Sequence, residues 1–141
     1  MTIGETDLAT LLRTLDPVLD GNEWVFVRVG DSEVPKYMPH ALASFREPEG
    51  MTLVMPRIKA TEIEHSSAPM ARITLRVHSS LEAVGLTAAV SRVLANDGIS
   101  ANMIAAYYHD HVFVPQALAD RAMNCLRGLS RAGNSFDPRA C

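Results

Sequence analysis

The residues with the most evident capacity for chemistry are the two histidines and the aspartate of the segment His109-Asp110-His111. Two histidines separated by one residue can both bind a metal ion, and a carboxylate between them can join them or orient one imidazole ring. A stable metal site takes about four ligands, however, and the other histidines of the chain occur singly. A short polar segment between two predicted strands is also typical of a solvated turn. We therefore expect no metal at His109 and His111.

No established pattern of catalytic residues occurs along the chain. It contains no G-x-S-x-G, Walker, G-x-G-x-x-G or H-E-x-x-H motif. Cys125 falls on the apolar stripe of a predicted helix, which is typical of a core cysteine, and Cys141 is the last residue. Glu47 and Glu49 flank Pro48 in a predicted turn, where solvation is the usual state of a carboxylate. The sequence thus predicts a protein that is not an enzyme and needs no cofactor.

Composition excludes several classes of protein. The 141 residues are 48% hydrophobic and 21% charged, and 13 Lys and Arg stand against 16 Asp and Glu, so the basic footprint of a nucleic-acid-binding protein is missing. No apolar run approaches the ~18 residues of a membrane span, and the first residues lack the pattern of a secretion signal. Two cysteines indicate reduced thiols. We expect a cytoplasmic protein without nucleic-acid or membrane partners.

Hydrophobic periodicity and turn residues predict the elements of the first half. In order, they are a helix over 8–15 that is capped by Thr6 and ends before Asp20-Gly21, a strand over 24–29, a loop over 30–40, a hairpin of strands 41–45 and 51–55 around Glu47–Gly50, and a short helix over 58–63.

The second half shows a sharper pattern, because apolar residues alternate over 73–77 and then recur at helical spacing over 86–94. The predicted order is a strand over 73–77, a helix over 86–94 ended by Asp97-Gly98, a strand region over 99–108, a turn over 109–111, a strand over 112–114, and a helix from Pro115 whose apolar stripe runs from Leu118 to Leu129. We expect the residues after Arg131 to form a frayed tail.

This order predicts an α+β fold with antiparallel sheets and helices on one face. We place a boundary at 65–69, which gives an N-terminal lobe over 1–69, a C-terminal lobe over 70–131 and a flexible tail over 132–141. A complete ferredoxin-like unit is βαββαβ, and residues 70–131 lack the final strand. An open apolar edge promotes aggregation, so we expect strand exchange between the lobes, with Trp24–Val29 filling the vacancy.

The segments Ser80–Val90 and Leu94–Ile104 resemble an ACT domain, closest to the ACT modules of aspartokinases and CASTOR-like arginine sensors. The shared features are a strand, a small-residue loop with glycine, an Ala-rich helix, a Gly-Ile turn and a strand that opens with asparagine. The resemblance spans about 70–130. Residues 40–77 resemble a more degenerate ACT-type lobe, as in small bacterial proteins with two such halves and no attached enzyme.

The resemblance implies a regulatory module that binds a small molecule, most often an amino acid, and that pairs as a homodimer. In this family the ligand lies between two ACT units, against the loop after the first strand and the opening residues of a facing strand. The residues at these positions are Ser79, Ser80, Leu81, Glu82, Gly85, Leu86, Asn102, Met103 and Ile104, with His78 as a further candidate. The acidic residue usual before the glycine loop is replaced here by His78-Ser79-Ser80.

The chemistry of these residues suits an amino acid. Backbone N–H groups at a helix start favour a carboxylate, Glu82 can hold an ammonium group, and Asn102 both donates and accepts hydrogen bonds. Gly85 permits close approach of a ligand. His78 can bond a carboxylate and titrate near neutral pH.

The same residues also have purely structural interpretations. Ser79 and Glu82 fit the S-x-x-E capping box, which alone explains their spacing. Gly85 can serve close packing of a helix on a sheet, Asn102 can stabilise the turn at Gly98, and His78 can be an exposed edge residue.

Three functions follow, in order of preference. The first is an amino-acid sensor without catalytic activity. The second is a protein-interaction module of the same fold that binds no ligand, and the third is a small enzyme or a metal protein built on the turn at His109 and His111. The sequence predicts neither which amino acid is bound nor which protein receives the signal.

Overall fold

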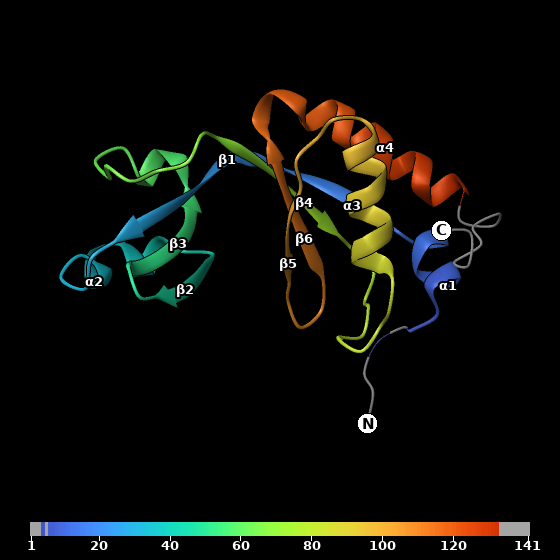
Figure 1. Ribbon diagram of the computed structural model, residues 1–141, viewed down its shortest axis with the longest axis horizontal. Coiled ribbons are helices and arrows are strands. Elements are labelled where there is room, and N and C mark those ends of the chain that lie inside the picture. The colour runs from blue at the N-terminus through green and yellow to red at the C-terminus, as the bar shows by residue number, and fades with distance from the viewer. Residues whose placement is uncertain (1–3, 5, 133–141) are drawn as a thin grey trace. The chain divides into compact units, whose positions relative to one another are not determined.

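The computed structural model describes residue 4 and residues 6–132 (Figure 1). The helices and strands are α1 (Leu8–Arg13), β1 (Pro17–Val29), α2 (Val34–Tyr37), β2 (Ala43–Glu47), β3 (Gly50–Pro56), β4 (Met70–Leu75), α3 (Leu86–Asn96), β5 (Asn102–Ala105), β6 (Asp110–Pro115) and α4 (Ala119–Arg131). Short 3₁₀ turns lie at Met38–His40, Arg57–Lys59 and Gln116–Leu118. The chain divides into two compact units: unit 1 comprises residues 1–20 and 72–141, and unit 2 comprises residues 21–71.

Unit 2 is built on an antiparallel sheet. Residues 24–29 of β1 pair with β3, with Trp24 opposite Pro56 and Val29 opposite Met51, and β3 pairs in turn with β2. The tight turn between β2 and β3 is the one that the sequence predicts, and Gly50 there has φ +141°. Apolar side chains of alternate strand residues form the core of this unit: Val25, Val27, Val29, Met51, Leu53 and Met55, with Tyr37 and Ala60.

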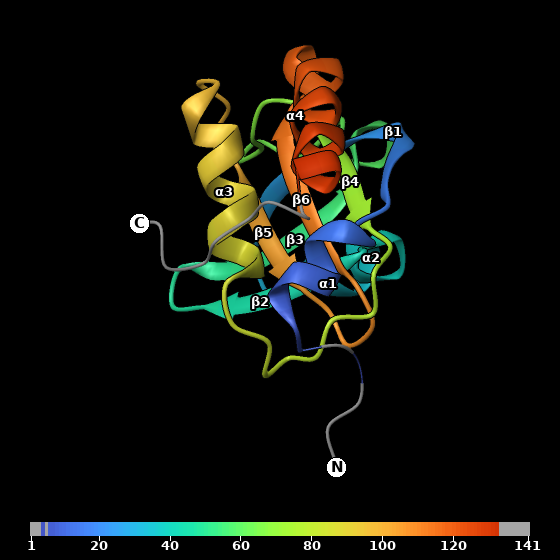
Figure 2. The same ribbon diagram turned by 90° about the vertical axis from the view of Figure 1, so that its right-hand side faces the viewer.

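In unit 1, strands follow the order β1-β4-β6-β5. β5 and β6 form an antiparallel hairpin in which Ala105 lies opposite Asp110. Figure 2 shows that α1, α3 and α4 all lie on one side of β4, β5 and β6. The buried side chains of this unit come from the helices and from alternate strand residues, among them Leu11, Ile73, Leu75, Val90, Leu94, Val112, Val114 and Leu126. The fold is α+β and ferredoxin-like, as the sequence predicts.

The helix α3 shows how closely its sequence determines its bounds. Leu86, Val90 and Leu94 recur at helical spacing and are all buried. Its last turn closes with hydrogen bonds from the N–H groups of Asp97 and Gly98 to the carbonyls of Leu94 and Ala95, at 3.1 and 2.9 Å. Gly98 has φ +71°, which favours glycine at the end of a helix.

The strand exchange occurs with a different segment from the one predicted. Residues 24–29 pair with β3 on one side, and on the other Arg28 donates to the carbonyl of His65 at 3.0 Å, so this segment lies in unit 2. The part of β1 that belongs to unit 1 is its beginning. There Arg76 donates its backbone N–H to the carbonyl of Asp16 at 2.9 Å, and Arg72 forms an ion pair with Asp20 at 3.6 Å.

Several local predictions are wrong. The cap of α1 is Asp7, which accepts from the Thr10 N–H at 3.0 Å, rather than Thr6. Asp20-Gly21 lies inside β1 and ends no helix. Residues 30–40 contain α2 and a 3₁₀ turn, and the helix expected over 58–63 is the single turn Arg57–Lys59.

The turn expected at His109-Asp110-His111 begins three residues earlier. The N–H of Ala106 donates to the carbonyl of His109 at 3.1 Å, which places Tyr107 and Tyr108 at the tip, while Asp110 and His111 belong to β6. The helix α4 ends at Arg131. The rest of the predicted tail, residues 133–141 with Cys141, lies outside the described residues. Among the described residues, no helix is both long and apolar enough to cross a membrane.

Candidate functional site

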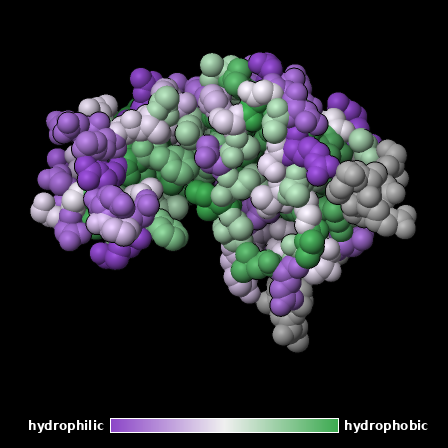
Figure 3. Space-filling model, viewed as in Figure 1, coloured by the Kyte–Doolittle hydropathy of each residue, from purple (hydrophilic) through white to green (hydrophobic). Residues whose placement is uncertain are grey.

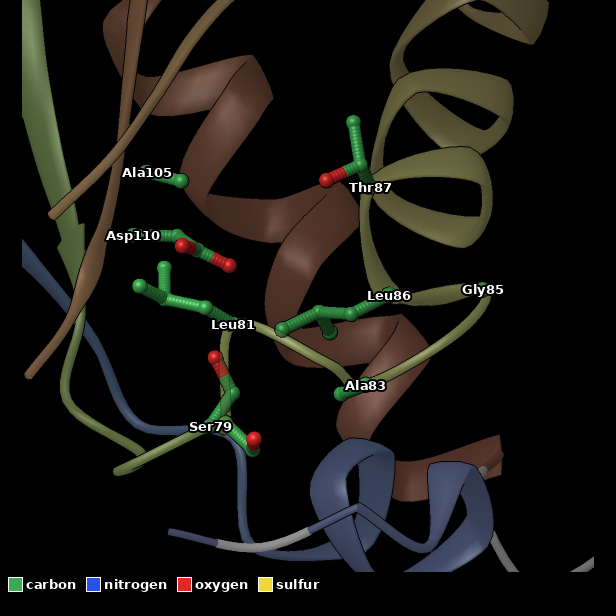
Figure 4. Close-up of a pocket in the computed structure, with 9 residues that line it drawn as sticks. Ser79, Leu81, Ala83, Gly85, Leu86, Thr87, Ala105 and Asp110 are labelled. Carbon is green, nitrogen blue, oxygen red and sulfur yellow. The ribbon is translucent and has the colours of Figure 1, made fainter. Parts of the chain in front are cut away.

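A pocket of about 160 Å³ lies in unit 1, between the loop that joins β4 to α3, the first turn of α3 and the β5–β6 hairpin (Figure 4). Nine residues line it: Ser79, Ser80, Leu81, Ala83, Gly85, Leu86, Thr87, Ala105 and Asp110.

Hydrogen bonds within the loop shape its lower wall. The Ser79 N–H donates to the carbonyl of Val77 at 2.9 Å. The Ser80 hydroxyl accepts from the Glu82 N–H at 3.1 Å, and the Ser80 carbonyl accepts from the Ala83 N–H at 3.0 Å. These bonds form tight turns, so Ser79 and Ser80 are buried beside the pocket rather than exposed on its rim.

Gly85 brings the chain from the loop into α3. Its φ of +101° is one that residues with a side chain rarely adopt. A Cβ at this position would come within 2.8 Å of Cδ2 of Leu8, because α1 packs against Gly85. The loop is therefore held between α1 and α3.

The beginning of α3 offers free hydrogen-bond donors. No side chain caps this helix at Gly85, and the first helical bond runs from the Ala89 N–H to the Gly85 carbonyl at 2.9 Å. The backbone N–H groups of Leu86 and Thr87 thus have no acceptor within the helix. Together with the helix dipole, such N–H groups attract negative charge.

Asp110 supplies a negative charge on the opposite wall. Its side chain is buried, with 8% of the residue exposed. Burial raises the pKa of this carboxyl above its usual value, while a hydrogen bond with Ser79 and the nearby His109 lower it in part. Figure 4 shows the Asp110 carboxylate and the Thr87 hydroxyl facing the same space from β6 and α3. Within residues 4 and 6–132, no ion pair engages Asp110.

This arrangement matches the charges of a zwitterion. A buried carboxylate without a cationic partner is unfavourable unless a ligand supplies the positive charge. Free N–H groups at the start of α3 can receive a ligand's carboxylate a short distance away.

The structure brings some of the sequence-predicted site residues together and leaves others apart. Ser79, Ser80, Leu81, Gly85 and Leu86 line the pocket. Glu82 is exposed and does not line it.

The predicted strand residues Asn102, Met103 and Ile104 lie on β5, and none of them lines the pocket, which the end of this strand reaches through Ala105. The amide of Asn102 instead approaches the carbonyl of Phe113 within the hairpin, at 3.5 Å. The predicted His78 also lies outside the lining. Its ring centre is 5.2 Å from that of Tyr108.

Sequence reasoning did not propose Ala83, Thr87, Ala105 or Asp110 as ligand-binding residues. The alternation of residues along β6 could have indicated that Asp110 is buried. Asp110, Val112 and Val114 share one face of the strand, and all three are buried. A strand that begins at Asp110 directs the carboxylate toward the helices, whereas a turn over 109–111 exposes it.

The capping-box interpretation of Ser79 and Glu82 is wrong, because α3 begins at Leu86 and not within the loop. Ser79 instead hydrogen-bonds Asp110.

The two histidines beside Asp110 have separate partners. Nδ1 of His111 lies 3.0 Å from the Thr74 hydroxyl, and Nδ1 of His109 lies 3.4 Å from the Val77 carbonyl. Burial lowers the pKa of His111, and the charges of Arg72 and His109 lower it further. In the part of the chain that the structure describes, no three His, Cys, Asp or Glu side chains are arranged to hold a metal.

Unit 2 has a larger pocket, of about 330 Å³, but its charged residues face water. Lys36 and Glu62 form an ion pair at 3.7 Å with side chains 59% and 80% exposed. Such exposed pairs contribute little and are satisfied without a ligand. The buried carboxylate of Asp110 therefore makes the pocket of unit 1 the stronger candidate.

Comparison with known proteins agrees with the fold. An ACT-domain family model matches residues 3–72, and a second one matches residues 69–128. Comparison with curated proteins found no significant relative. A Vibrio cholerae protein of unknown function, described as a possible transport protein, is 46% identical with a TM-score of 0.77, over 87% of this chain and 95% of that one.

Two more distant structures share the fold. A protein from Agrobacterium tumefaciens is 13% identical with a TM-score of 0.68, over 82% of this chain and 89% of that one. The regulatory subunit of aspartate kinase from Thermus flavus is 11% identical with a TM-score of 0.57, over 80% of this chain and 95% of that one. With two family models matched in tandem, the chain belongs to the ACT-domain family and carries two ACT repeats.

Proposed function

We propose that this protein is a regulatory module without catalytic activity and that unit 1 binds an α-amino acid in the pocket beside α3. The observation that carries the proposal is the buried carboxylate of Asp110 facing the uncapped start of α3. In this arrangement Asp110 binds the ligand's ammonium group, and the N–H groups of Leu86 and Thr87 bind its carboxylate. ACT domains typically bind amino acids in regulatory roles, which supports the same proposal.

The pocket loop offers a route by which the ligand would change the protein. Gly85 packs against Leu8 of α1, and a Cβ on Gly4 would come within 2.9 Å of the Ser80 nitrogen. The helix α1 leads through residues 14–16 directly into β1. A ligand that stabilises one arrangement of the loop would therefore favour one arrangement of α1, and a partner that distinguishes the two would respond to the ligand.

A thermal-denaturation screen with the twenty amino acids tests this function. A ligand that binds only the folded protein adds about 2.7 kcal/mol to the free energy of unfolding when its concentration is 100 times its Kd. We expect one amino acid or a few related ones to raise the melting temperature in proportion to the logarithm of their concentration. If none of the twenty changes it at millimolar concentration, the pocket is not an amino-acid site.

We also propose that the protein forms a homodimer through the apolar side chains around the mouth of the pocket. Leu81 and Val84 of the loop and Tyr107 and Tyr108 of the β5–β6 turn are all exposed. Figure 3 shows apolar residues at the lower end of unit 1, where this loop and turn lie in Figure 1. Exposed apolar patches on soluble proteins commonly mark interaction surfaces.

Introduction of a charge into this apolar patch tests the dimer. Val84 is 82% exposed, so Val84→Asp leaves the core intact, and we expect it to weaken dimerisation at least tenfold in sedimentation equilibrium. The matched control is Ile58→Asp in unit 2, which is 76% exposed and lies away from this patch. A monomeric wild-type protein, or equal effects of the two substitutions, would contradict the proposed interface.

The setting we propose is the bacterial cytoplasm. The low cysteine content supports it.

A further inference from the structure

The pocket of unit 1 holds a single ionisable side chain. Of its nine lining residues, only Asp110 carries a charge, and the polar groups beside it are the hydroxyls of Ser79, Ser80 and Thr87. A ligand whose own side chain is charged would bring that charge into the pocket without a partner, which is unfavourable. Asp110 and the start of α3 are already occupied by the ammonium and carboxylate groups that every α-amino acid carries, so they cannot also bind a charged side chain.

The size of the pocket sets a second limit. Its volume is about 160 Å³, and a protein cavity of about 150 Å³ is known to hold benzene, which has six non-hydrogen atoms. Alanine has the same number of non-hydrogen atoms, and serine, threonine and valine have only slightly more. Phenylalanine has twice as many non-hydrogen atoms as alanine, and lysine also has more than valine.

The lining shows where a ligand's side chain would lie. Leu86 and the Thr87 hydroxyl face the space in front of Asp110 from α3, and the Leu81 side chain lies beside the Asp110 carboxylate on the other wall (Figure 4). Leu81 lines the pocket and is nevertheless 67% exposed, so its side chain lies at the opening of the pocket, where a ligand's side chain would contact it.

We infer that the pocket selects α-amino acids with small uncharged side chains and that Leu81 sets the size limit. This inference rests on the proposed function, since it concerns the same pocket and assumes that an amino acid binds there. It assigns the class of ligand, and it explains how a site with one buried carboxylate can exclude lysine, arginine, aspartate and glutamate.

Isothermal titration calorimetry with the full chain tests the ligand class. The probes are alanine, serine, threonine and valine against lysine, aspartate and phenylalanine, each titrated into the wild type and into Asp110→Asn. We expect at least one small neutral amino acid to bind ten times or more tightly than any of the other three. If lysine, aspartate or phenylalanine binds as tightly as the small amino acids or more tightly, and Asp110→Asn abolishes this binding, the inference is wrong but the proposed function stands. Absence of binding by all seven overturns the inference, and absence of binding by all twenty amino acids overturns the proposed function as well.

Leu81→Ala tests the size limit independently. Leu81 is 67% exposed, so its truncation leaves the core intact, and we expect the affinity for phenylalanine relative to alanine to rise at least tenfold. The matched control is Val84→Ala, which shortens an exposed side chain of the same loop that does not line the pocket. An unchanged ratio in Leu81→Ala, or the same change in Val84→Ala, shows that Leu81 does not set the limit.

Discussion

Asp110→Asn is expected to abolish the amino-acid response and to make the ligand-free protein more stable. The asparagine has nearly the shape of the aspartate but no charge, so it cannot form the ion pair with the ligand's ammonium group. Removal of one partner from a buried charge pair costs about 2–5 kcal/mol of binding free energy, which is a loss of affinity of at least about thirty-fold.

Although Asp110→Asn weakens ligand binding, it should increase the stability of the ligand-free protein. Burial raises the pKa of Asp110, so the ionised carboxylate is less favourable in the folded protein than in the unfolded chain. Substitution by a neutral amide removes this cost. We therefore expect Asp110→Asn to have a higher free energy of unfolding than the wild type in urea at neutral pH.

Glu82→Gln is the matched control for this prediction. It also removes one carboxylate, from the adjacent loop, but Glu82 is exposed and does not line the pocket. We expect this variant to keep both the ligand response and the wild-type stability. If Glu82→Gln loses the ligand response and Asp110→Asn keeps it, Glu82 binds the ligand's ammonium group, as the sequence alone suggested.

The elements that the sequence predicts correctly are those determined by neighbouring residues. The helical spacing of Leu86, Val90 and Leu94 gives α3, and the turn Glu47–Gly50 gives the β2–β3 hairpin. The ACT resemblance, carried by the glycine loop and the strand after it, also predicts the family correctly.

The start of β1 could not be predicted in this way. Asp20-Gly21 resembles the end of a helix, yet it lies within a strand. What holds this segment extended is pairing with distant residues, such as the hydrogen bond from Arg76 to Asp16. Strand formation depends on such partners more than on local preference.

The same reason explains why the sequence does not point to Asp110 as a candidate for ligand binding. As part of His109-Asp110-His111 it resembles a polar turn, because all three side chains are hydrophilic. The pairing of Ala105 with Asp110 places the turn before this segment, and the alternation of β6 then buries the carboxylate. A change of register by one residue would direct it to the other face of the sheet.

The affinity for the amino acid is expected to fall on acidification, beginning at a higher pH than an ordinary aspartate would give. The ammonium group of the ligand favours ionised Asp110, so binding displaces the proton from that carboxyl. Below the raised pKa of Asp110 in the free protein, each unit of pH should therefore weaken binding about tenfold. Titration calorimetry between neutral and mildly acidic pH measures this slope, and any weak binding that remains in Asp110→Asn at high ligand concentration should not show it.

Acidification should change protein stability in the opposite direction to ligand affinity, so the effect of Asp110 on binding can be distinguished from its effect on unfolding. Because the pKa of Asp110 is higher in the folded protein than in the unfolded chain, the folded protein binds more protons between the two pKa values. This group alone therefore adds stability as the pH falls through that interval, while ligand affinity decreases. Affinity that stays constant down to the ordinary pKa range of aspartate would show that Asp110 does not bind the ammonium group.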